Sequence, residues 1–274
     1  MPKDKPELSD AMRKKLSGSL REKKPINGTK FTIAISSAKG GVGKSTFAPN
    51  LALALKQNGC KVGLLDADIY GPSIPKMFGI NEKPKSDGQK LEPVIKYDIQ
   101  CMSIGFLTDE KTPMIWRGPM VTSAIKTFTQ QVKWKDLDFI IVDMPPGTGD
   151  AQLTFSQGIE MDGAIIVSTP QEVALLDVKR GIKMFDKLNV KVLGLIDNMS
   201  FFVGDDGKKY NIFGEGGVKK TAEEFNKDFL GEIPINPDVG KQGDLGLPIV
   251  ENDPQHEISK IYLDLAKKLK SIFF

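Results

Sequence analysis

The chain has 274 residues, of which 40% are hydrophobic and 27% charged, and its formal net charge at pH 7 is +3. These values are typical of a globular protein that buries one sizeable core. No run approaches the roughly 18 apolar residues that a membrane span requires, and the start MPKDKPELSD lacks the apolar core of a secretory signal. We therefore expect a cytoplasmic protein with one folded domain.

Sulfur and imidazole ligands are scarce in this chain. Cys60 and Cys101 are the only cysteines, and His256 is the only histidine. This composition excludes a disulfide framework and a histidine-based metal site. Because both cysteines have apolar neighbours in the sequence, we expect them to be small residues of the hydrophobic core.

Positive charge is concentrated in an N-terminal tail, residues 1–28, that precedes the expected domain at residues 29–274. Residues 1–30 contain nine lysines and arginines against four acidic residues. Leucine or methionine recurs at every fourth position from 8 to 20, so one interpretation is an amphipathic helix that docks on the domain or on a partner. The alternative is an ordinary solvated tail. Attraction of about 1 kcal/mol per basic residue is marginal for membrane binding without a second anchor, so we do not expect a membrane partner. We expect no nucleic acid partner either.

The segment at residues 31–46, FTIAISSAKGGVGKST, has the order strand, glycine-rich loop, helix. Apolar residues at positions 31, 33 and 35 predict a buried strand. The loop is a variant of the G-x-x-x-x-G-K-[ST] pattern whose first glycine is Ala38, and it is expected to wrap its backbone N–H groups around phosphates. The predicted nucleotide-binding residues of this loop are Ala38, Lys39, Gly40, Gly41, Val42, Gly43, Lys44, Ser45 and Thr46.

The side chains of the loop have separate expected roles. Lys44 would contact the β- and γ-phosphate oxygens, Ser45 would coordinate Mg²⁺, and Thr46 would donate to the α-phosphate. Lys39 cannot easily fold back onto phosphates that Lys44 already contacts, so it is a candidate to act on a nucleotide held by a second copy of the chain. Pro49 lies about one turn into the following helix, where a local bend is expected.

Acidic residues follow two further predicted strands. The strand at residues 62–65 runs into Asp66 and Asp68, whose spacing points both carboxylates to the same side. A second apolar strand ends in Asp143, the arrangement expected for a residue that holds Mg²⁺ through water. Gly147, in the loop after that strand, is placed to offer its backbone N–H to the γ-phosphate. The predicted metal ligands are therefore Ser45, Asp66 and Asp143, and the predicted catalytic residues of the loop are Lys39 and Lys44.

Strands and helices alternate along the rest of the chain. The expected strands lie at residues 99–104, 164–168, 191–196 and 230–235, and the expected helices at residues 171–188, 218–225 and 255–272. This alternation predicts an α/β fold with a doubly wound, mostly parallel sheet and a site along its carboxyl edge. Together with the phosphate loop, it indicates a P-loop NTPase domain.

Several motifs resemble those of the Mrp/ApbC family of iron-sulfur carrier ATPases, which belongs with MinD and ParA to the deviant Walker A class. They are KGGVGKST (39–46), DADIYGPSIPKMFG (66–79), MSIGFL (102–107), DMPPGTGDAQLT (143–154), STPQEVALLDVKRG (168–181) and IDNMSFF (196–202). The resemblance implies a homodimer that hydrolyses ATP with Mg²⁺ and acts in iron-sulfur cluster assembly or transfer with client or scaffold proteins. It implies that Asp68 orients the attacking water and that Asp66 lies near the magnesium. It also implies that Asn198 reads the adenine edge and that Asn236 and Pro237 close over the base.

The chain departs from that family just after the asparagine motif. Cluster-carrying members have a C-P-x-C pair there, whereas this chain has Gly-Asp-Asp-Gly at residues 204–207. Thiolates are the usual ligands of iron-sulfur clusters. The Gly-Asp-Asp-Gly sequence instead predicts a tight turn between short strands at residues 201–203 and 208–212. A bound cluster is thus implied by the resemblance and not by this segment.

Two other functions stay open from the sequence. A positioning protein of the MinD or ParA type, gated by ATP and free of any cluster, would account for the missing thiolates and the basic tail. Anaerobic reconstitution with iron and sulfide would separate the two: a chromophore that depends on Cys60 or Cys101 is expected for the carrier, and none for the positioning protein. A dehydrogenase fits less well, because the glycine loop ends in Gly-Lys-Ser and not in G-x-G-x-x-G.

Overall fold

The computed structural model describes residues 23–107, 116 and 118–274, so the predicted tail lies outside it except for residues 23–28. The strands are β1 (Thr29–Ser36), β2 (Val62–Asp66), β3 (Lys85–Ser86), β4 (Leu91–Glu92), β5 (Val94–Lys96), β6 (Ile99–Ser103), β7 (Leu137–Asp143), β8 (Gly163–Ser168), β9 (Val192–Val203), β10 (Lys209–Tyr210) and β11 (Phe229–Ile235). The α-helices are α2 (Lys44–Gln57), α3 (Ile74–Met77), α4 (Gly118–Lys126), α5 (Asp150–Gly158), α6 (Glu172–Lys187), α7 (Gly217–Glu224), α8 (Pro237–Asp244), α9 (Ile249–Asn252) and α10 (Glu257–Phe273). A short 3₁₀ helix (Ile104–Leu107) follows β6, and a π-helical turn (Thr127–Gln131) extends α4.

The strands form one large sheet in the order β10-β9-β8-β1-β7-β2-β6-β5, with β11 paired to β9 and a separate β3-β4 hairpin. All pairs among β1, β2, β6, β7, β8, β9 and β11 are parallel, while β5 and β10 run antiparallel to their neighbours. The predicted doubly wound, mostly parallel sheet is confirmed.

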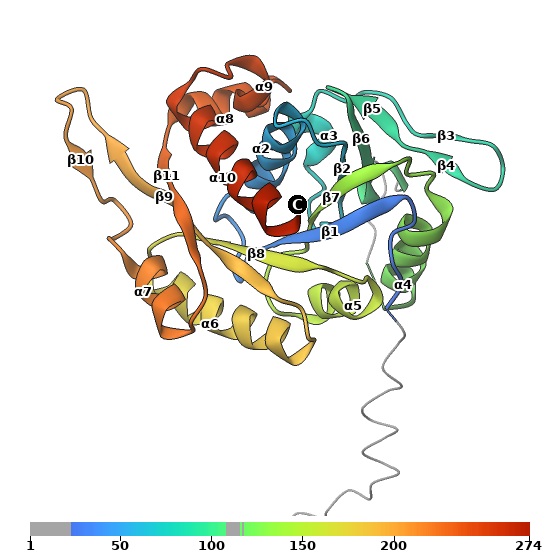
Figure 1. Ribbon diagram of the computed structural model, residues 1–274, viewed down its shortest axis with the longest axis horizontal. Coiled ribbons are helices and arrows are strands. Elements are labelled where there is room, and N and C mark those ends of the chain that lie inside the picture. Colours follow the sequence, from blue (N-terminus) through green and yellow to red (C-terminus); the bar gives the residue numbers. More distant parts are fainter. Residues whose placement is uncertain (1–22, 108–115, 117) are drawn as a thin grey trace, which may run out of the picture.

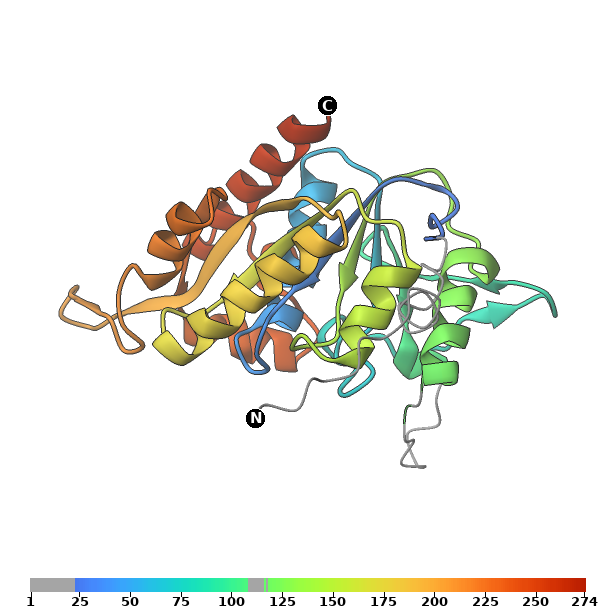
Figure 2. The ribbon, with the colours of Figure 1, turned by 90° about the horizontal axis from the view of Figure 1, so that it is seen from below.

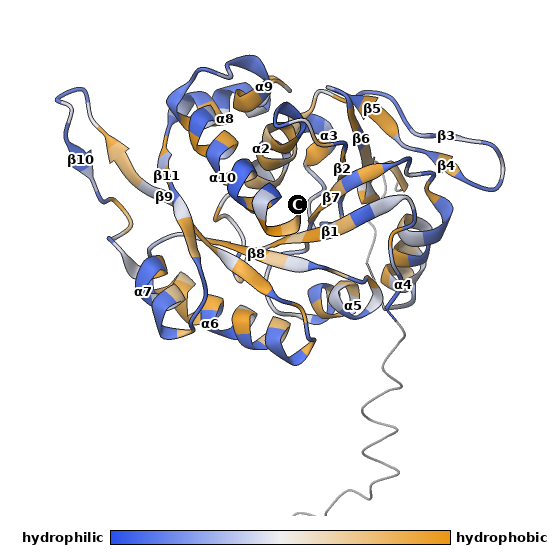
Figure 3. Ribbon diagram, in the orientation of Figure 1, coloured by the Kyte–Doolittle hydropathy of each residue, from blue (hydrophilic) through white to orange (hydrophobic). Residues whose placement is uncertain are grey.

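Helices cover both faces of the sheet (Figure 1). On one face α2, α3, α9 and α10 pack against the strands, and on the other α4, α5, α6 and α7 do so. In Figure 2, α5 and α6 lie toward the viewer, in front of the strands. The central strands are largely hydrophobic, with polar sections mainly toward their ends, and the helices are hydrophobic on one side (Figure 3). This is the pattern expected when a parallel sheet is buried on both faces. None of the helices in the described ranges is both long and apolar enough to span a membrane.

The strands that carry the predicted site are neighbours at the centre of the sheet. Strand β7 lies between β1 and β2, and Asp143 at its end is in register with Ile35 of β1 and with Asp66 of β2. Because parallel strands end at the same edge, the phosphate loop after β1 and the acidic residues after β2 and β7 meet there.

Several elements differ from the sequence expectations. Helix α5 was not predicted, because its nine residues begin directly after a Gly/Pro-rich loop and give too short a stretch for a clear helical period. Strand β9 is longer than expected and joins the predicted strands at 191–196 and 201–203, with Met199 at a positive φ of 54° between them. Helix α2 continues through Pro49 as one helix.

The predicted turn at residues 204–207 is confirmed as the tip of the hairpin between β9 and β10. The Gly207 N–H donates to the Gly204 carbonyl at 2.9 Å, and Gly207 has a φ of 73° that favours glycine. Asp206 accepts hydrogen bonds from the Lys208 N–H and the Tyr210 hydroxyl, both at 3.0 Å. The carboxylate of Asp206 is therefore engaged within the hairpin itself.

Residues 23–28 follow the surface of the domain and pack against it. Lys24 forms an isolated bridge with Ile159, at the end of α5, and Ile26 is buried in the core on the α4–α7 face. The domain boundary at residue 28 and the helical tail stay predictions, since most of the tail lies outside the described residues.

Candidate active site

The phosphate loop runs from the end of β1 to the start of α2. Gly41 and Gly43 have φ values of 82° and 85°, in the left-handed region that favours glycine. A Cβ atom added to Gly43 would lie 2.2 Å from Nδ2 of Asn198, closer than any real contact. Gly43 is therefore required both by its backbone conformation and by the side chain that packs on it.

Asn198 holds the loop from a strand that is not adjacent to β1. It lies on β9, beyond β8, and its Nδ2 donates to the Val42 carbonyl at 2.8 Å. This contact fixes the backbone between the loop glycines. The predicted contact of Asn198 with the adenine edge stays a prediction, and its amide nitrogen already serves the loop in this structure.

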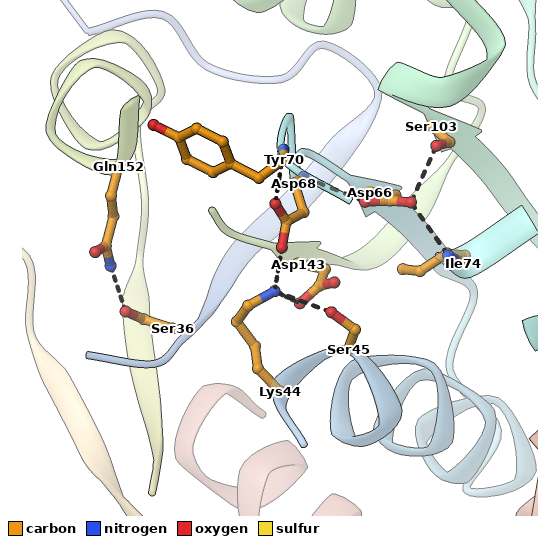
Figure 4. Close-up of polar contacts among 10 residues, drawn as sticks. All are labelled: Ser36, Lys44, Ser45, Asp66, Asp68, Tyr70, Ile74, Ser103, Asp143 and Gln152. Atoms are coloured by element: carbon orange, nitrogen blue, oxygen red, sulfur yellow. Dashed lines mark hydrogen bonds and ion pairs between the residues drawn. The ribbon is translucent and has the colours of Figure 1, made fainter. Parts of the chain in front are cut away.

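The ammonium group of Lys44 lies between two of the predicted acidic residues. Lys44 Nζ is 2.6 Å from Asp143 Oδ1, 3.3 Å from Asp68 Oδ2 and 3.1 Å from Ser45 Oγ (Figure 4). Lys44 and Asp143 are buried, with 5% and 0% exposure. The structure thus brings together four predicted site residues from α2, from the loop after β2 and from the end of β7.

Asp143 offers the clearest position for a divalent cation. Its Oδ2 is buried and accepts no hydrogen bond from the described residues. Burial raises the pKa of the Asp143 carboxyl above its ordinary value, and the adjacent Lys44 ammonium and Ser45 hydroxyl oppose this shift. An unpaired buried carboxylate oxygen beside a hydroxyl is the hard oxygen donor set that suits Mg²⁺. Asp143 and Ser45 therefore fit the implied magnesium.

Asp66 is fully buried and is surrounded by hydrogen-bond donors (Figure 4). Its Oδ2 accepts from the Ser103 hydroxyl at 3.0 Å and the Ile74 N–H at 3.2 Å, and its Oδ1 accepts from the Asp68 N–H at 3.2 Å. Burial and the charge of nearby Asp143 raise the pKa of Asp66 to about 7. Asp66 thus shapes the loop that carries Asp68, and its role as a metal ligand stays a prediction.

Two polar residues of the site were missed by the sequence analysis. Ser103 lies at the end of β6, in register with Asp66 on β2, so the strand order would have revealed it. Gln152, on the unpredicted helix α5, donates from Nε2 to the Ser36 hydroxyl at the end of β1 (Figure 4). Ser36 and Gln152 are buried, and their contact joins helix α5 to the end of β1, just before the phosphate loop.

The loop after β7 is tied to the phosphate loop through Gly147. Its φ is 88°, and its N–H donates to the Ser37 carbonyl at 2.8 Å. This N–H would have to leave Ser37 to reach a γ-phosphate. The predicted phosphate contact of Gly147 therefore stays a prediction that requires a movement of this loop.

The remaining predicted residues lie at the rim of the site. Lys39 is exposed, and no side chain in the described part of the chain binds its ammonium group. Asn236 caps α8, where its Oδ1 accepts from the Asp238 N–H at 2.8 Å, and Pro237 is the first residue of that helix. Their roles in trans action and base binding stay predictions.

The thiols do not fit an iron-sulfur cluster. Cys60 and Cys101 are both buried, as predicted, and burial raises the pKa of each thiol. A protonated, buried thiol is a poor cluster ligand, because the thiolate is the form that binds metal. Over residues 23–107, 116 and 118–274, no group of three or more His, Cys, Asp or Glu side chains could hold a metal ion.

Comparisons with known proteins identify similar sequences and folds. A model of the ParA family described as NUBPL iron-transfer P-loop NTPase matches residues 28–270. The iron-sulfur cluster carrier protein of Aquifex aeolicus is 50% identical over 254 residues, which cover 91% of this chain and 70% of that protein. The iron-sulfur cluster transfer protein NUBPL of Mus musculus is 48% identical over 258 residues, which cover 93% of this chain and 81% of that protein.

Solved structures show the same fold. The nucleotide-binding protein of Archaeoglobus fulgidus, in complex with ADP, is 41% identical with a TM-score of 0.71, covering 80% of this chain and 87% of its own. The septum site-determining protein MinD of Pyrococcus horikoshii, complexed with Mg-ADP, has a TM-score of 0.67 at 20% identity and covers 89% of this chain and 97% of its own. At 20% identity, the similarity to MinD concerns the fold alone.

Proposed function

Because the chain belongs to the ParA family, in its branch of NUBPL iron-transfer P-loop NTPases, and is thus an ATP hydrolase, we propose that Lys44, Asp68 and Asp143 form its catalytic centre. The observation that carries this proposal is the position of Lys44 Nζ between Asp143 Oδ1 and Asp68 Oδ2 at the carboxyl edge of the sheet. At this edge Lys44 can contact the phosphates, Asp143 can bind the metal ion, and Asp68 can accept a hydrogen bond from the attacking water.

In this proposal the acidic residues and the lysine exchange partners when Mg-ATP binds. Lys44 turns from the carboxylates to the β- and γ-phosphate oxygens, where its charge stabilises the transferring group. Asp143 and Ser45 would hold the magnesium, which would supply positive charge against the phosphates. Asp68, released from Lys44, accepts a hydrogen bond from the attacking water and orients it toward the γ-phosphate.

The nucleotide is held on both sides of this centre. The N–H groups of the phosphate loop bind the phosphates, while Asn198, Asn236 and Pro237 contact the base. We propose that Lys39 reaches the nucleotide of a second copy in a homodimer, which its exposure and its lack of a partner among the described residues support. The ADP in the Archaeoglobus fulgidus relative, at 41% identity, supports an adenine nucleotide.

We propose that the cycle serves iron-sulfur cluster transfer in the cytoplasm, with the cluster as cargo. The names of the bacterial and mouse relatives support this function over the positioning protein. Since Cys60 and Cys101 are buried, a client or scaffold protein supplies the thiolates that hold the cluster. The proposed partners are therefore cluster-bearing proteins and a second copy of this chain.

The catalytic part is tested with Asp68→Asn. This variant keeps the shape of the side chain but removes its charge, so kcat for ATP should fall about 10²- to 10⁴-fold. Since Lys44 and the loop still hold the phosphates, the Kd of ATP should change little. The exposed hairpin variant Asp205→Asn is the matched control and should keep wild-type turnover. Wild-type turnover in Asp68→Asn would refute the assignment.

The cargo part is tested by transfer of a preformed [4Fe-4S] cluster from a loaded scaffold protein to an apo-ferredoxin. Mg-ATP should accelerate transfer in the presence of this chain, and Asp68→Asn should abolish the acceleration. A rate of cluster transfer that is the same with and without ATP, together with ATP-dependent co-sedimentation with liposomes or DNA, would favour the positioning protein instead.

A further inference from the structure

Two amide side chains of α2 hold a single residue of α9. Asn50 Oδ1 accepts from the Val250 N–H at 3.2 Å, and Gln57 Nε2 donates to the Val250 carbonyl at 2.8 Å. Asn50 and Gln57 are seven residues apart, which places them on one face of the helix two turns from each other. Both polar groups of the Val250 backbone are therefore bound by the helix that begins at the phosphate loop.

Asn50 also bonds within the first turns of α2, next to the phosphate loop. Its Nδ2 donates to the carbonyl of Thr46, in the first turn of α2, at 2.9 Å, and the side chain is only 2% exposed. Helix α9 has four residues, so it cannot hold its own shape, and its first N–H groups have no partner within the helix. One buried side chain thus links Thr46 to the start of α9.

Helices α8 and α9 form one segment, residues 236–253, in which α9 packs against α2 and α8 packs against α3 (Figure 1). The connection between α8 and α9 is fixed as well. The Tyr97 hydroxyl donates to the Gly246 carbonyl at 2.8 Å, and Gly246 packs so tightly that a Cβ there would lie 2.6 Å from the Gly79 Cα. Gly79 follows α3, which begins after the Asp68 loop. The segment is therefore braced between the phosphate-loop helix and the acidic loop.

We propose that Asn50 and Gln57 are positioning residues that fix residues 236–253 at the distance from the phosphate loop that the base of ATP requires. This inference rests on the proposed function, in which Asn236 and Pro237 contact the base. Phosphate binding by Lys44 and the loop needs no such brace, whereas a base and a triphosphate bound together need both subsites at a fixed separation. Loosening the brace should therefore weaken ATP and leave inorganic triphosphate unaffected.

The test compares the Kd values of Mg-ATP and Mg-tripolyphosphate, measured by calorimetry, in Asn50→Ala and Gln57→Ala. Each variant should weaken ATP about five- to tenfold, the effect of one lost hydrogen bond, and change tripolyphosphate by less than about twofold. The matched control is Asn58→Ala, because Asn58 is an amide residue at the C-terminal end of α2 but donates to the Leu263 carbonyl of α10 at 3.1 Å. This control should leave both Kd values unchanged.

Three outcomes overturn the inference: equal weakening of both ligands, no weakening of either, or the same selective loss in Asn58→Ala. Gln57 is exposed, so its variant should fold even if Asn50→Ala does not, and its result then decides. Failure of the proposed function has a different signature, namely a wild-type protein that binds tripolyphosphate no more weakly than ATP or binds neither.

Discussion

The packing of Asn198 on the phosphate loop leads to a quantitative prediction for three glycines. Gly40 has no neighbour within 4 Å of an added Cβ and no positive φ, Gly41 has a φ of 82° with open space, and Gly43 has a φ of 85° with Asn198 Nδ2 at 2.2 Å. Replacing each by alanine separates three effects: the entropy of the unfolded chain at Gly40, the left-handed backbone at Gly41, and the added clash with Asn198 at Gly43.

The magnitudes follow from the structure. Alanine at position 40 should change the free energy of unfolding by less than about 1 kcal/mol, since only the entropy of the unfolded chain changes. Gly41→Ala adds a left-handed alanine, which costs about 1–2 kcal/mol. Gly43→Ala adds the displacement of the Asn198 amide, and the Val42 carbonyl loses its partner, for a further cost of about 1–3 kcal/mol. The expected total for Gly43→Ala is about 2–5 kcal/mol.

The assay is equilibrium unfolding in urea without nucleotide, so that effects on ligand binding do not enter. In an Asn198→Ala background the clash is absent, and the cost of Gly43→Ala should fall to that of Gly41→Ala. The reasoning is refuted if Gly43→Ala is no more destabilising than Gly41→Ala, or if removal of the Asn198 side chain leaves its cost unchanged.

Three further predictions concern charge and sulfur. Burial and the neighbouring Glu232 raise the pKa of Asp197 to about 7, so the folded state favours the protonated acid, and the free energy of unfolding should fall as the pH rises from about 4 to 7. Asp197→Asn should remove this contribution to the pH dependence of the unfolding free energy. Urea titrations at several pH values measure it, and the same pH dependence in both proteins would contradict the prediction. Lys39→Ala should lower ATP turnover about 10³- to 10⁵-fold with little change in ATP affinity, and steady-state rates near wild type would exclude a trans role. Anaerobic reconstitution of this chain alone should give no iron-sulfur chromophore, and an absorbance that disappears in Cys60→Ser or Cys101→Ser would show that a buried thiol does bind iron.

The sequence was sufficient for the parts of the site that depend on local order. The phosphate loop and Asp143 were predicted because a strand, a turn and a charged residue follow one another directly in the chain. The α/β fold class and the family resemblance were confirmed for the same reason, since both rest on consecutive motifs. The hairpin at residues 201–212 was also predicted from its central glycines and aspartates.

Contacts that depend on the order of strands were not available from the sequence. Ser103 reaches Asp66 only because β6 pairs with β2, and Asn198 reaches Val42 from β9 across β8. Neither pairing leaves a signal in the spacing of residues. Gln152 was missed because α5 was missed, and Asn50 because a buried amide in a helix has no partner until the fold supplies Val250.

The central claim is that the loop at residues 38–46 and Asp143 bind a nucleoside triphosphate together with magnesium. Calorimetric titration of ATP into the purified full chain, with Mg²⁺ and again with excess EDTA, tests this claim most directly. We predict clear binding that weakens at least about tenfold when Mg²⁺ is removed, as expected for the loss of a cation between the phosphates and a carboxylate. Affinity for ATP that is absent at millimolar concentrations, or that is the same with and without magnesium, would contradict the account.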